Sequence, residues 1–506
     1  MSLIAANIGM NYSELLRLAS PEIVVTITAL AVLAIGLTRG RSTGPAGASP
    51  ASALCSLFSV LGLILAVGAV LYLPRNATLF GGMLVISPLN SLFKIVCLVL
   101  AFFTVILARG DTAARNQGEY LALILLATIG LMLLVGSEEL LMIFIGLELT
   151  GLSLYVLAAF DKTDLRSAEA GLKYFLFGST ASAFTLFGLS FIYGMCATTS
   201  LTAIAQQLST GAAQPLLFAG IVMTLIGLAF KVAAAPFHLW APDTYQGAPV
   251  PSAAFIASGS KVAAFVVLGK ILLMGFGPLH GSAAWHALVA GWAPVLAVLA
   301  ALSILTGNFV ALAQKNVRRL LAYSAVAHGG YTLLGLVAVG NEGFSATLFY
   351  TTVYAFTLVG AFGVVAMVRR ETGGDDLQNF SGLRSRSSLL AGCMAIFMLS
   401  LAGLPPLAGF FGKFYLFSAA LHNDPNHGLL WLVILALFGS LISLYYYLMV
   451  LKVIFVDEPL ALETSLSRHR FSDGLQQISL AALAAIVVFL GIAPAPLVAR
   501  ILASLP

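Results

Sequence analysis

The sequence predicts an all-α protein that crosses a membrane about fourteen times. Of its 506 residues, 60% are hydrophobic and only 9% are charged, and the mean hydropathy is +1.01. This composition is typical of a polytopic membrane protein and excludes a soluble domain of this length. The formal net charge of +5 therefore indicates basic cytoplasmic loops and not a nucleic-acid partner.

Apolar runs in the sequence predict the individual spans. A helix needs ~20 residues to cross the ~30 Å hydrocarbon core of a bilayer. Two runs, 215–247 and 388–420, exceed this length and contain prolines, which break helices because proline has no backbone N–H and clashes with the preceding turn. In chain order the runs are 20–38, 52–73, 88–108, 119–136, 139–159, 166–195, 215–247, 250–275, 286–313, 317–339, 344–368, 388–420, 429–456 and 475–503.

The basic residues of the loops predict the orientation of the chain. Most of the 25 lysines and arginines lie in or beside alternate loops. The positive-inside rule then places both termini outside, which requires an even number of spans; fourteen and twelve both satisfy it. The N-terminus lacks a basic segment and a cleavage site, so we expect it to be retained. The residues on the basic side are Arg39, Arg41, Arg109, Arg115, Lys162, Arg166, Lys315, Arg318, Arg319, Arg369, Arg370, Arg384, Arg386, Arg468 and Arg470, and those on the other side are Arg17, Arg75 and Arg500.

The basic residues well inside the predicted spans are all lysines, and all sixteen arginines lie in loops or at the ends of the spans. Arginine keeps its proton in proteins, whereas a desolvated lysine can release it, so this division indicates proton handling. The alternative is that a flexible lysine merely extends its amine to the membrane surface, which fits Lys452 and Lys94. The seven lysines are Lys94, Lys173, Lys231, Lys261, Lys270, Lys413 and Lys452.

The stretch from Gly227 to Asp243 is the principal candidate site. Lys231 lies deep in an apolar run, and Pro236 must interrupt the helix five residues later. Backbone freed at membrane depth is tolerated only where it is buried in protein or lines a wet cavity. A charge beside a broken helix is therefore typical of an ion-transport site. A lysine near a helix end that extends to the surface is the alternative.

A second broken run repeats this pattern, because Pro405 and Pro406 precede Lys413. Two broken, lysine-bearing spans five helices apart predict two structural repeats, at helices 4–8 and 9–13, with helices 7 and 12 broken. We expect four segments in the chain. They are an N-terminal three-helix segment (1–110), a first repeat (119–275), a second repeat (286–456) and a connector with the last helix (457–506).

Acidic residues are sparse in the predicted spans, and Glu148 is the clearest one. A lone carboxylate at that depth must be protonated or find a cation. Glu169 precedes Lys173 by one helical turn, so the two can pair. We expect Glu138 and Glu139, at the outer end of the fifth span, to be solvated.

Two more lysines and two histidines complete the candidates. Lys261 and Lys270 are nine residues apart, which places them on opposite faces of one helix about 13 Å apart along its axis. We favour Lys261, which is the deeper of the two. His238 and His328 can relay protons because histidine titrates near neutral pH; a neutral histidine bonded to backbone is the alternative.

The sequence shows no pattern for a bound cofactor. Its four cysteines, Cys55, Cys97, Cys196 and Cys393, lie far apart, so we expect no disulfide, zinc site or iron–sulfur cluster. GxGxxG, Walker and HExxH motifs are absent. We therefore predict a transport protein that binds no cofactor of its own.

Three motifs carry a resemblance to a known family. They are the stretch from Lys231 through Asp243 to Pro251, Glu148 within Gly-Leu-Glu-Leu, and Leu-Pro-Pro followed by Gly-Lys413. Together they resemble the antiporter-like membrane subunits of bacterial respiratory complex I, the NADH:quinone oxidoreductase, over nearly the whole chain. Pro21-Glu22 at the start, the length and the lack of a long lateral helix after the last span are similar to the N type of these subunits. D-type subunits of multisubunit Na⁺(K⁺)/H⁺ antiporters share the motifs and are the alternative.

The resemblance implies a fourteen-helix fold with two inverted five-helix repeats and a proton-pumping function. It implies that Glu148 pairs with Lys231, that Lys173 lies close to this pair, and that a relay continues through Lys261 to Lys413. It also implies K- and M-like membrane subunits as partners, and NADH, FMN, iron–sulfur clusters and quinone bound by partner subunits. The location would be the bacterial inner membrane, with both termini on the periplasmic side.

Overall fold

The computed structural model describes residues 12–39, 50–111, 113, 116–210, 214–422, 426–459 and 474–505. Within these ranges twelve helices are long and apolar enough to cross a membrane, and two shorter apolar helices, Pro215–Lys231 and Ser388–Ala402, lie in the two proline-broken runs. The predicted all-α membrane fold is confirmed, while the count of fourteen spans and the repeats stay predictions. The expectations for Arg41, Arg115, Arg468, Arg470 and the connector 460–473 fall outside the described residues.

The chain divides into two compact units. Unit 1 contains residues 1–231, 259–280 and 504–506, and unit 2 contains residues 232–258 and 281–503. The chain thus leaves unit 1 directly after Lys231 and returns to it at Gly259, two residues before Lys261. The predicted division into four segments remains a prediction.

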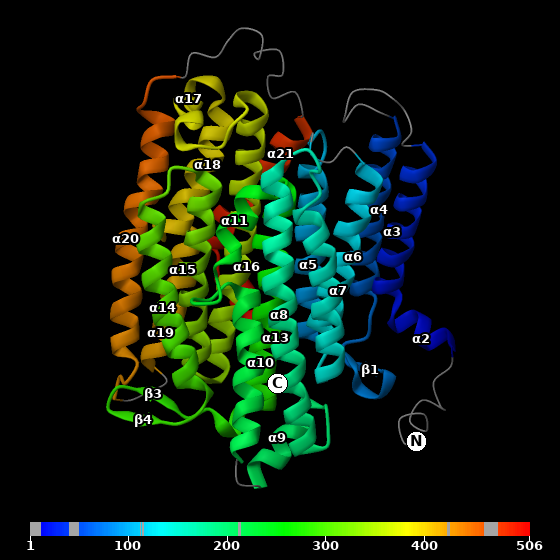
Figure 1. Cartoon of the computed structure of the whole chain (residues 1–506), viewed down its shortest axis with the longest axis vertical. Coiled ribbons are helices and arrows are strands. Elements are labelled where there is room, and N and C mark those ends of the chain that lie inside the picture. Colours follow the sequence, from blue (N-terminus) through cyan, green and yellow to red (C-terminus); the bar gives the residue numbers. More distant parts are fainter. Residues whose placement is uncertain are drawn as a thin grey trace. The chain divides into compact units, whose positions relative to one another are not determined.

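Unit 1 is almost entirely helical (Figure 1). Its longer helices cross most of the unit, and one small antiparallel β-hairpin joins α4 to α5. Its elements are α2 (Tyr12–Leu18), α3 (Ser20–Arg39), α4 (Pro50–Leu71), β1 (Ala77–Leu79), η1 (Phe80–Gly82), β2 (Leu84–Ile86), α5 (Pro88–Leu107), α6 (Gln117–Gly136), α7 (Leu140–Ala158), α8 (Leu165–Cys196), α9 (Leu201–Thr210), α10 (Pro215–Val232), α13 (Gly259–Gly269), η2 (Lys270–Gly275) and η3 (Gly277–Leu279).

Helix α6 holds unit 1 together, because it packs against α3, α5, α7 and α13. The approach of α3 to α6 is close: a Cβ atom on Gly36 would lie only 2.6 Å from the Cα atom of Gly118. Small residues at such contacts let helix backbones meet, which compensates for the weak hydrophobic drive between helices in lipid. Packing around α6 therefore positions α7 and α13, which carry candidate site residues.

Unit 2 contains the remaining helices and a second short β-hairpin. Its elements are α11 (Trp240–Gly247), α12 (Val250–Ala257), β3 (Ser282–Ala284), β4 (Ala287–Val289), α14 (Trp292–Leu312), α15 (Val317–Val337), α16 (Gly340–Thr372), η4 (Leu377–Phe380), α17 (Leu383–Arg386), α18 (Ser388–Ala402), α19 (Ala408–His422), α20 (Leu430–Phe455), α21 (Gly474–Ile492) and α22 (Ala495–Leu502).

Helix α16 forms the centre of unit 2. It contacts α12, α15, α18, α19, α21 and α22, and its most apolar window is completely buried. A helix that is apolar on all sides needs neighbours on all sides, which is what this arrangement supplies. Helices α14 and α15 form a closely packed pair, and α20 contacts both of them.

Both predicted helix breaks are present. Helix α10 ends at Val232 and α11 begins at Trp240, while α18 ends at Ala402 and α19 begins at Ala408. Each break contains a cis X-Pro peptide bond. The freed N–H groups find side-chain acceptors: Ala235 donates to Oγ of Ser303 at 2.8 Å, and Gly409 donates to Oγ of Ser400 at 3.2 Å. Buried hydroxyl groups thus replace the lost helical hydrogen bonds.

A buried ion pair ties the segment after α16 to the start of α15. The carboxylate of Asp375 accepts a hydrogen bond from Nε of Arg318 and another from the amide of Asn316 at 2.7 Å. A second guanidinium nitrogen of Arg318 donates to the carbonyl of Ala248 at 2.8 Å. Burial raises the pKa of Asp375, but Arg318, Arg369 and the Asn316 amide outweigh it, so the pKa lies below its usual value.

Replacing Asp375 by asparagine should destabilise unit 2. Arg318 is 2% exposed and would lose the carboxylate of its ion pair with Asp375, and removing one partner of a buried pair typically costs about 3–5 kcal/mol. Because the carboxyl pKa is depressed on folding, its contribution is present above the unfolded pKa of about 3.9 and is lost as the pH falls through the folded value. The check is the thermal unfolding midpoint of the purified protein in detergent.

The matched control for this prediction is Asp376→Asn. Asp376 is exposed and caps η4, and asparagine caps helices as well as aspartate does. We expect a much smaller decrease of the midpoint than for Asp375→Asn. Equal midpoints for the two variants would contradict the role given to the ion pair.

Candidate functional site

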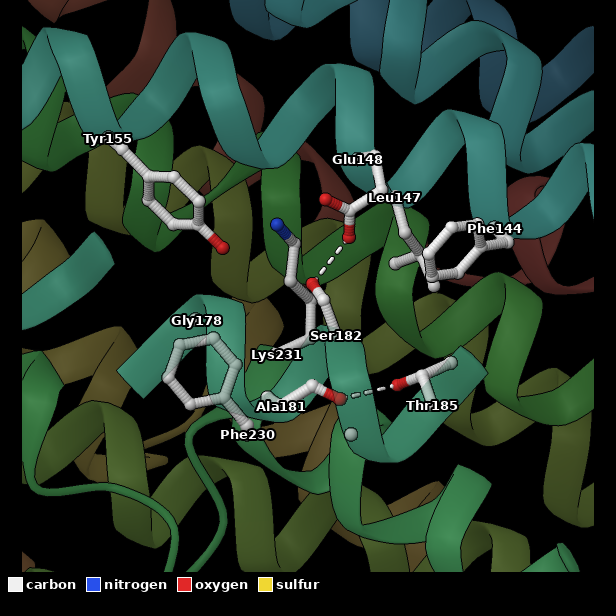
Figure 2. A pocket seen from close by; sticks show the side chains of 11 residues that line it. Phe144, Leu147, Glu148, Tyr155, Gly178, Ala181, Ser182, Thr185, Phe230 and Lys231 are labelled. Atoms are coloured by element: carbon white, nitrogen blue, oxygen red, sulfur yellow. Dashed lines mark hydrogen bonds between the residues drawn. The ribbon is translucent and has the colours of Figure 1, made fainter. Parts of the chain in front are cut away.

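A small cavity in unit 1 brings Glu148 and Lys231 together (Figure 2). It has a volume of about 20 Å³, which is room for about one water molecule. Helices α7, α8 and α10 supply its walls. The lining residues are Phe144, Leu147, Glu148, Tyr155, Gly178, Ala181, Ser182, Thr185, Gly227, Phe230 and Lys231.

Glu148 and Lys231 face the same space from opposite walls of this cavity. Figure 2 shows the amine of Lys231, from α10, directed toward the carboxylate of Glu148, from α7. The carboxylate accepts a hydrogen bond from the hydroxyl of Ser182 on α8. A water molecule between amine and carboxylate would complete the polar contacts, since the cavity has room for one. The sequence expectation that the two residues share one site is consistent with this geometry.

The three lysines of the predicted relay are all buried. Lys231 is 5% exposed, Lys261 2% and Lys413 5%. Lys261 lies in α13, every residue of which is buried. None of the three amines extends to the surface of its unit, so the surface-reaching alternative considered for Lys231 is wrong for this residue.

Lys173 lies in a different environment. Its amine forms an ion pair with Glu169 at 2.6 Å, which confirms the predicted pairing on one face of α8. The two side chains are 38% and 60% exposed, so the pair faces out of unit 1. Lys173 does not contribute to the cavity of Glu148 and Lys231.

Lys413 lies in the second turn of α19, beside the break that separates this helix from α18. Its amine donates to the carbonyl of Ala402 at 3.0 Å and to Oγ of Ser440 at 2.8 Å. It also lies 5.3 Å from the centre of the Tyr331 ring, within the range of a cation–π interaction. The last carbonyl of the broken helix thus serves as a ligand for the amine, and this explains why the lysine and the prolines occur together.

His328 on α15 lies between two tyrosines. Its Nδ1 atom is 2.5 Å from the hydroxyl of Tyr350, and its Nε2 atom is 3.0 Å from the hydroxyl of Tyr447. The hydroxyl of Tyr447 also bonds that of Ser324. Both ring nitrogens therefore contact groups that can give and accept a proton, and the backbone-bonded alternative for His328 is wrong.

The polar network of unit 2 extends further toward Lys413. The hydroxyl of Tyr446 donates to the side-chain carbonyl of Asn308 at 3.1 Å, and the Asn308 amide donates to the hydroxyl of Tyr331 at 2.9 Å. Tyr331 is the ring that lies beneath the amine of Lys413. We call Ser324, His328, Tyr350 and Tyr447, together with Asn308, Tyr331 and Tyr446, the tyrosine–histidine network.

His238 lies in the break between α10 and α11 and is not part of this network. It is nearly buried, its ring lies 6.3 Å from that of Tyr323, and its Nδ1 atom has no hydrogen-bond partner in the described part of the chain. The relay role of His238 stays a prediction.

Several polar residues of these sites were not predicted from the sequence. Ser182, Ser440 and the tyrosines of the network lie within long apolar helices, where serine and tyrosine are common and carry no pattern of their own. No spacing in the sequence links Tyr350 or Tyr447 to His328, so only the fold brings them together.

Two expectations about charged residues were wrong. Lys94 does not extend to the surface, because it is buried and its amine pairs with Glu22 at 2.6 Å. The carboxylate of Glu22 replaces water as the partner of the ammonium group. Glu139 is not solvated either, since it is buried and caps the start of α7 by accepting from the N–H of Met142 at 2.8 Å.

Comparison with known proteins places the chain in a family. The family model for the NADH:quinone oxidoreductase/Mrp antiporter transmembrane region matches residues 137–443. NADH-quinone oxidoreductase subunit N 2 of Acidobacterium capsulatum is 45% identical over 96% of this chain and 98% of its own length. A chain of respiratory complex I from Thermus thermophilus is 31% identical with a TM-score of 0.77, covering 95% of this chain and 98% of that one.

A more distant structure shares the fold alone. A chain of the Mrp complex from Dietzia sp. is 20% identical with a TM-score of 0.79, and the match covers 97% of both chains. The matched family region spans both broken helices, Glu148, Lys231 and Lys413. The chain therefore belongs to the NADH-quinone oxidoreductase subunit N family, within the wider family of NADH:quinone oxidoreductase and Mrp antiporter membrane proteins.

Proposed function

We propose that this chain is the proton-translocating subunit N of a bacterial NADH:quinone oxidoreductase. The observation that carries the proposal is the cavity in which the amine of the buried Lys231 faces the Glu148 carboxylate, in a chain of this family. The cavity between the amine and the carboxylate has room for about one water molecule, and the charges of the two groups depend on where the proton lies. Such a pair can be switched by a charge that arrives from a neighbour.

The proposed step starts from a protonated Lys231 beside an ionised Glu148. When a rearrangement elsewhere in the complex separates the two, the amine loses its counter-charge and holds its proton less tightly. A charge removed from ~4–6 Å changes proton affinity by about 1–3 pKa units, which is ~1.4–4 kcal/mol. That is enough to send the proton on to Lys261, with water bridging groups that cannot bond directly.

Lys413 is the proposed terminal carrier in unit 2. The amine rests on a helix-terminal carbonyl and a serine hydroxyl, and neither of these partners carries a full charge. The tyrosine–histidine network supplies a hydrogen-bonded chain near it, in which His328 can accept a proton at one ring nitrogen and donate from the other. Lys173, which pairs with Glu169 on an exposed face, and His238 are the outer candidates of this relay.

The redox chemistry belongs to the partners in this proposal. The chain acts as a translocase without a redox centre, while NADH, FMN, iron–sulfur clusters and quinone are bound by other subunits. K- and M-like membrane subunits would be its neighbours, in the bacterial inner membrane. Most basic loop residues lie on the side of the membrane opposite the two termini, which supports termini on the periplasmic side.

The alternative is a subunit of a multisubunit Na⁺(K⁺)/H⁺ antiporter. The family model covers both classes, and the fold of the Mrp chain is similar. A buried path made of lysines disfavours it, because ammonium groups repel metal cations. Purification from native membranes separates the two: flavin and iron–sulfur proteins in the same complex support the oxidoreductase, and their absence together with Na⁺-dependent proton exchange supports the antiporter.

Lys231 is the residue to test first. Lys231→Met and Lys231→Arg should both lower the protons moved per NADH oxidised, because neither side chain can release a proton in the membrane. Loss of a positioned acid–base group typically slows its step about 10²-fold or more. The measurement is NADH-driven proton uptake by inverted membrane vesicles, divided by NADH oxidation and by the amount of assembled complex.

Lys452, at the exposed end of α20, provides the matched control. Lys452→Met should pump as the wild type does. A wild-type proton yield for Lys231→Arg would exclude Lys231 as a carrier, and it would favour a passive scaffold that needs only the positive charge.

Tyr447→Phe tests the tyrosine–histidine network. It removes one hydroxyl, keeps the ring and leaves Nε2 of His328 without its partner, which typically costs ~1–3 kcal/mol. We expect slower proton pumping with normal assembly. Tyr445 precedes Tyr447 by two residues and is exposed, so Tyr445→Phe should change neither pumping nor assembly. Equal pumping rates for both variants would remove the network from the pathway.

A further inference from the structure

Unit 1 contains a second cluster of buried charges that the proposed relay does not use. Lys270, the first residue of η2, donates to Oδ1 of Asn90 at 2.5 Å and to the carbonyl of Val135 at 2.8 Å. The carbonyl of Ser137 and a carboxylate oxygen of Glu138 lie 3.4 and 3.5 Å from the same amine. Its three N–H groups therefore have oxygen partners, as a charged ammonium requires.

Lys94 belongs to the same cluster. Its amine pairs with Glu22 at 2.6 Å, and its side chain packs on the end of α6. A Cβ atom on Gly136 would lie 3.0 Å from Cε and 3.4 Å from Nζ of Lys94, so glycine leaves the space that the lysine needs. Because Lys270 bonds the carbonyls of Val135 and Ser137, the two amines share one three-residue segment. Like charges at such a site repel each other.

The two ion pairs have the same asymmetry. The side chain of Lys270 is 0% exposed and that of Glu138 19%, while Lys94 is 4% exposed and Glu22 12%. In each pair the amine is buried, and the carboxylate is the more exposed member. The pair of Lys173 and Glu169 differs because both of its side chains are exposed, at 38% and 60%. A gradient of this kind suits proton transfer between an interior and an aqueous surface.

The cluster also lies at the right place in unit 1. Lys270 follows Lys261 by nine residues on one continuous helical segment, about 13 Å along its axis. Glu138 lies just before α7, and Glu148 follows it by ten residues within that helix. The nearby segments, before α3 and between α4 and α5, contain few basic residues, namely Arg17 and Arg75. Loops poor in basic residues are expected outside, so the cluster lies at the end predicted to be periplasmic.

We propose that Glu22, Lys94, Lys270 and Glu138 form a proton port of unit 1, with Lys270 as the carrier and Glu138 as the group that exchanges protons with water. This inference rests on the proposed proton-pumping function and adds residues to it. In the release step an N–H bond of the Lys270 ammonium breaks and an O–H bond forms on Glu138, which leaves a neutral amine and a neutral carboxyl. The carboxyl then gives its proton to water, and the amine is recharged through water from Lys261.

The Lys94–Glu22 pair holds the charge of the port. While Lys270 is neutral, Lys94 remains on the same segment of α6 and keeps one positive charge there. Asn90 fixes the geometry, because its amide donates to the carbonyl of Val85 at 2.7 Å while its carbonyl oxygen accepts from Lys270. Asn90 and Lys94 are therefore positioning residues, one helical turn apart on α5.

A purely structural cap on the end of α6 is the competing explanation for Lys270. Arginine separates the two, since Lys270→Arg keeps a charge and hydrogen-bond donors but cannot release a proton. We expect Lys270→Arg to assemble and to lower the protons moved per NADH by as much as Lys231→Met does in the same inverted vesicles. Lys452→Arg, the exposed control, should keep the wild-type yield.

The outcomes distinguish the port from the function on which it rests. A wild-type yield for Lys270→Arg together with a low yield for Lys231→Met overturns the port and leaves the proposed function in place. Wild-type yields for both variants overturn both. If Lys270→Arg does not assemble, Glu138→Gln decides: this variant keeps an acceptor near Lys270 but cannot take up a proton. A low yield with normal assembly supports the port, and a wild-type yield overturns it.

Discussion

An ammonium group buried in a membrane protein needs oxygen atoms around it, and this requirement explains much of the architecture. Moving such a charge out of water costs several kcal/mol, which only carboxylates, carbonyls, hydroxyls or trapped water can offset. Each buried lysine meets the requirement in its own way. Lys94 has a carboxylate, Lys270 has an amide and helix-terminal carbonyls, and Lys413 has the carbonyl of a broken helix.

The broken helices follow from the same requirement. An intact helix uses its carbonyls internally and offers nothing to a side chain at mid-membrane. Ending α18 at Ala402 frees a carbonyl that Lys413 binds, and the freed N–H of Gly409 is satisfied by Ser400. In the break after α10, Ser303 satisfies Ala235 in the same manner. At the break before α19, the prolines thus free a carbonyl group that serves as a ligand of Lys413.

The chemistry of unit 2 differs from that of unit 1. In unit 1 a carboxylate shares a cavity with the relay lysine, whereas in unit 2 Lys413 has neutral partners and the nearby titratable groups are a histidine and tyrosines. In the proposed relay, unit 1 contributes a charged pair, and unit 2 contributes a hydrogen-bonded chain of hydroxyl groups and a histidine.

By itself the sequence determined the membrane fold class, both helix breaks and the family. These follow from local rules: run length, proline chemistry and short motifs that are contiguous in the chain. It also proposed Glu148, Lys231, Lys261 and Lys413 as site residues, because a charge in an apolar run is conspicuous, and these roles stay predictions. Only the tertiary structure paired Lys94 with Glu22, surrounded His328 with two tyrosines and gathered the second charge cluster. Those partners are as many as 180 residues apart, and which helix faces meet is decided by packing, which no local pattern records.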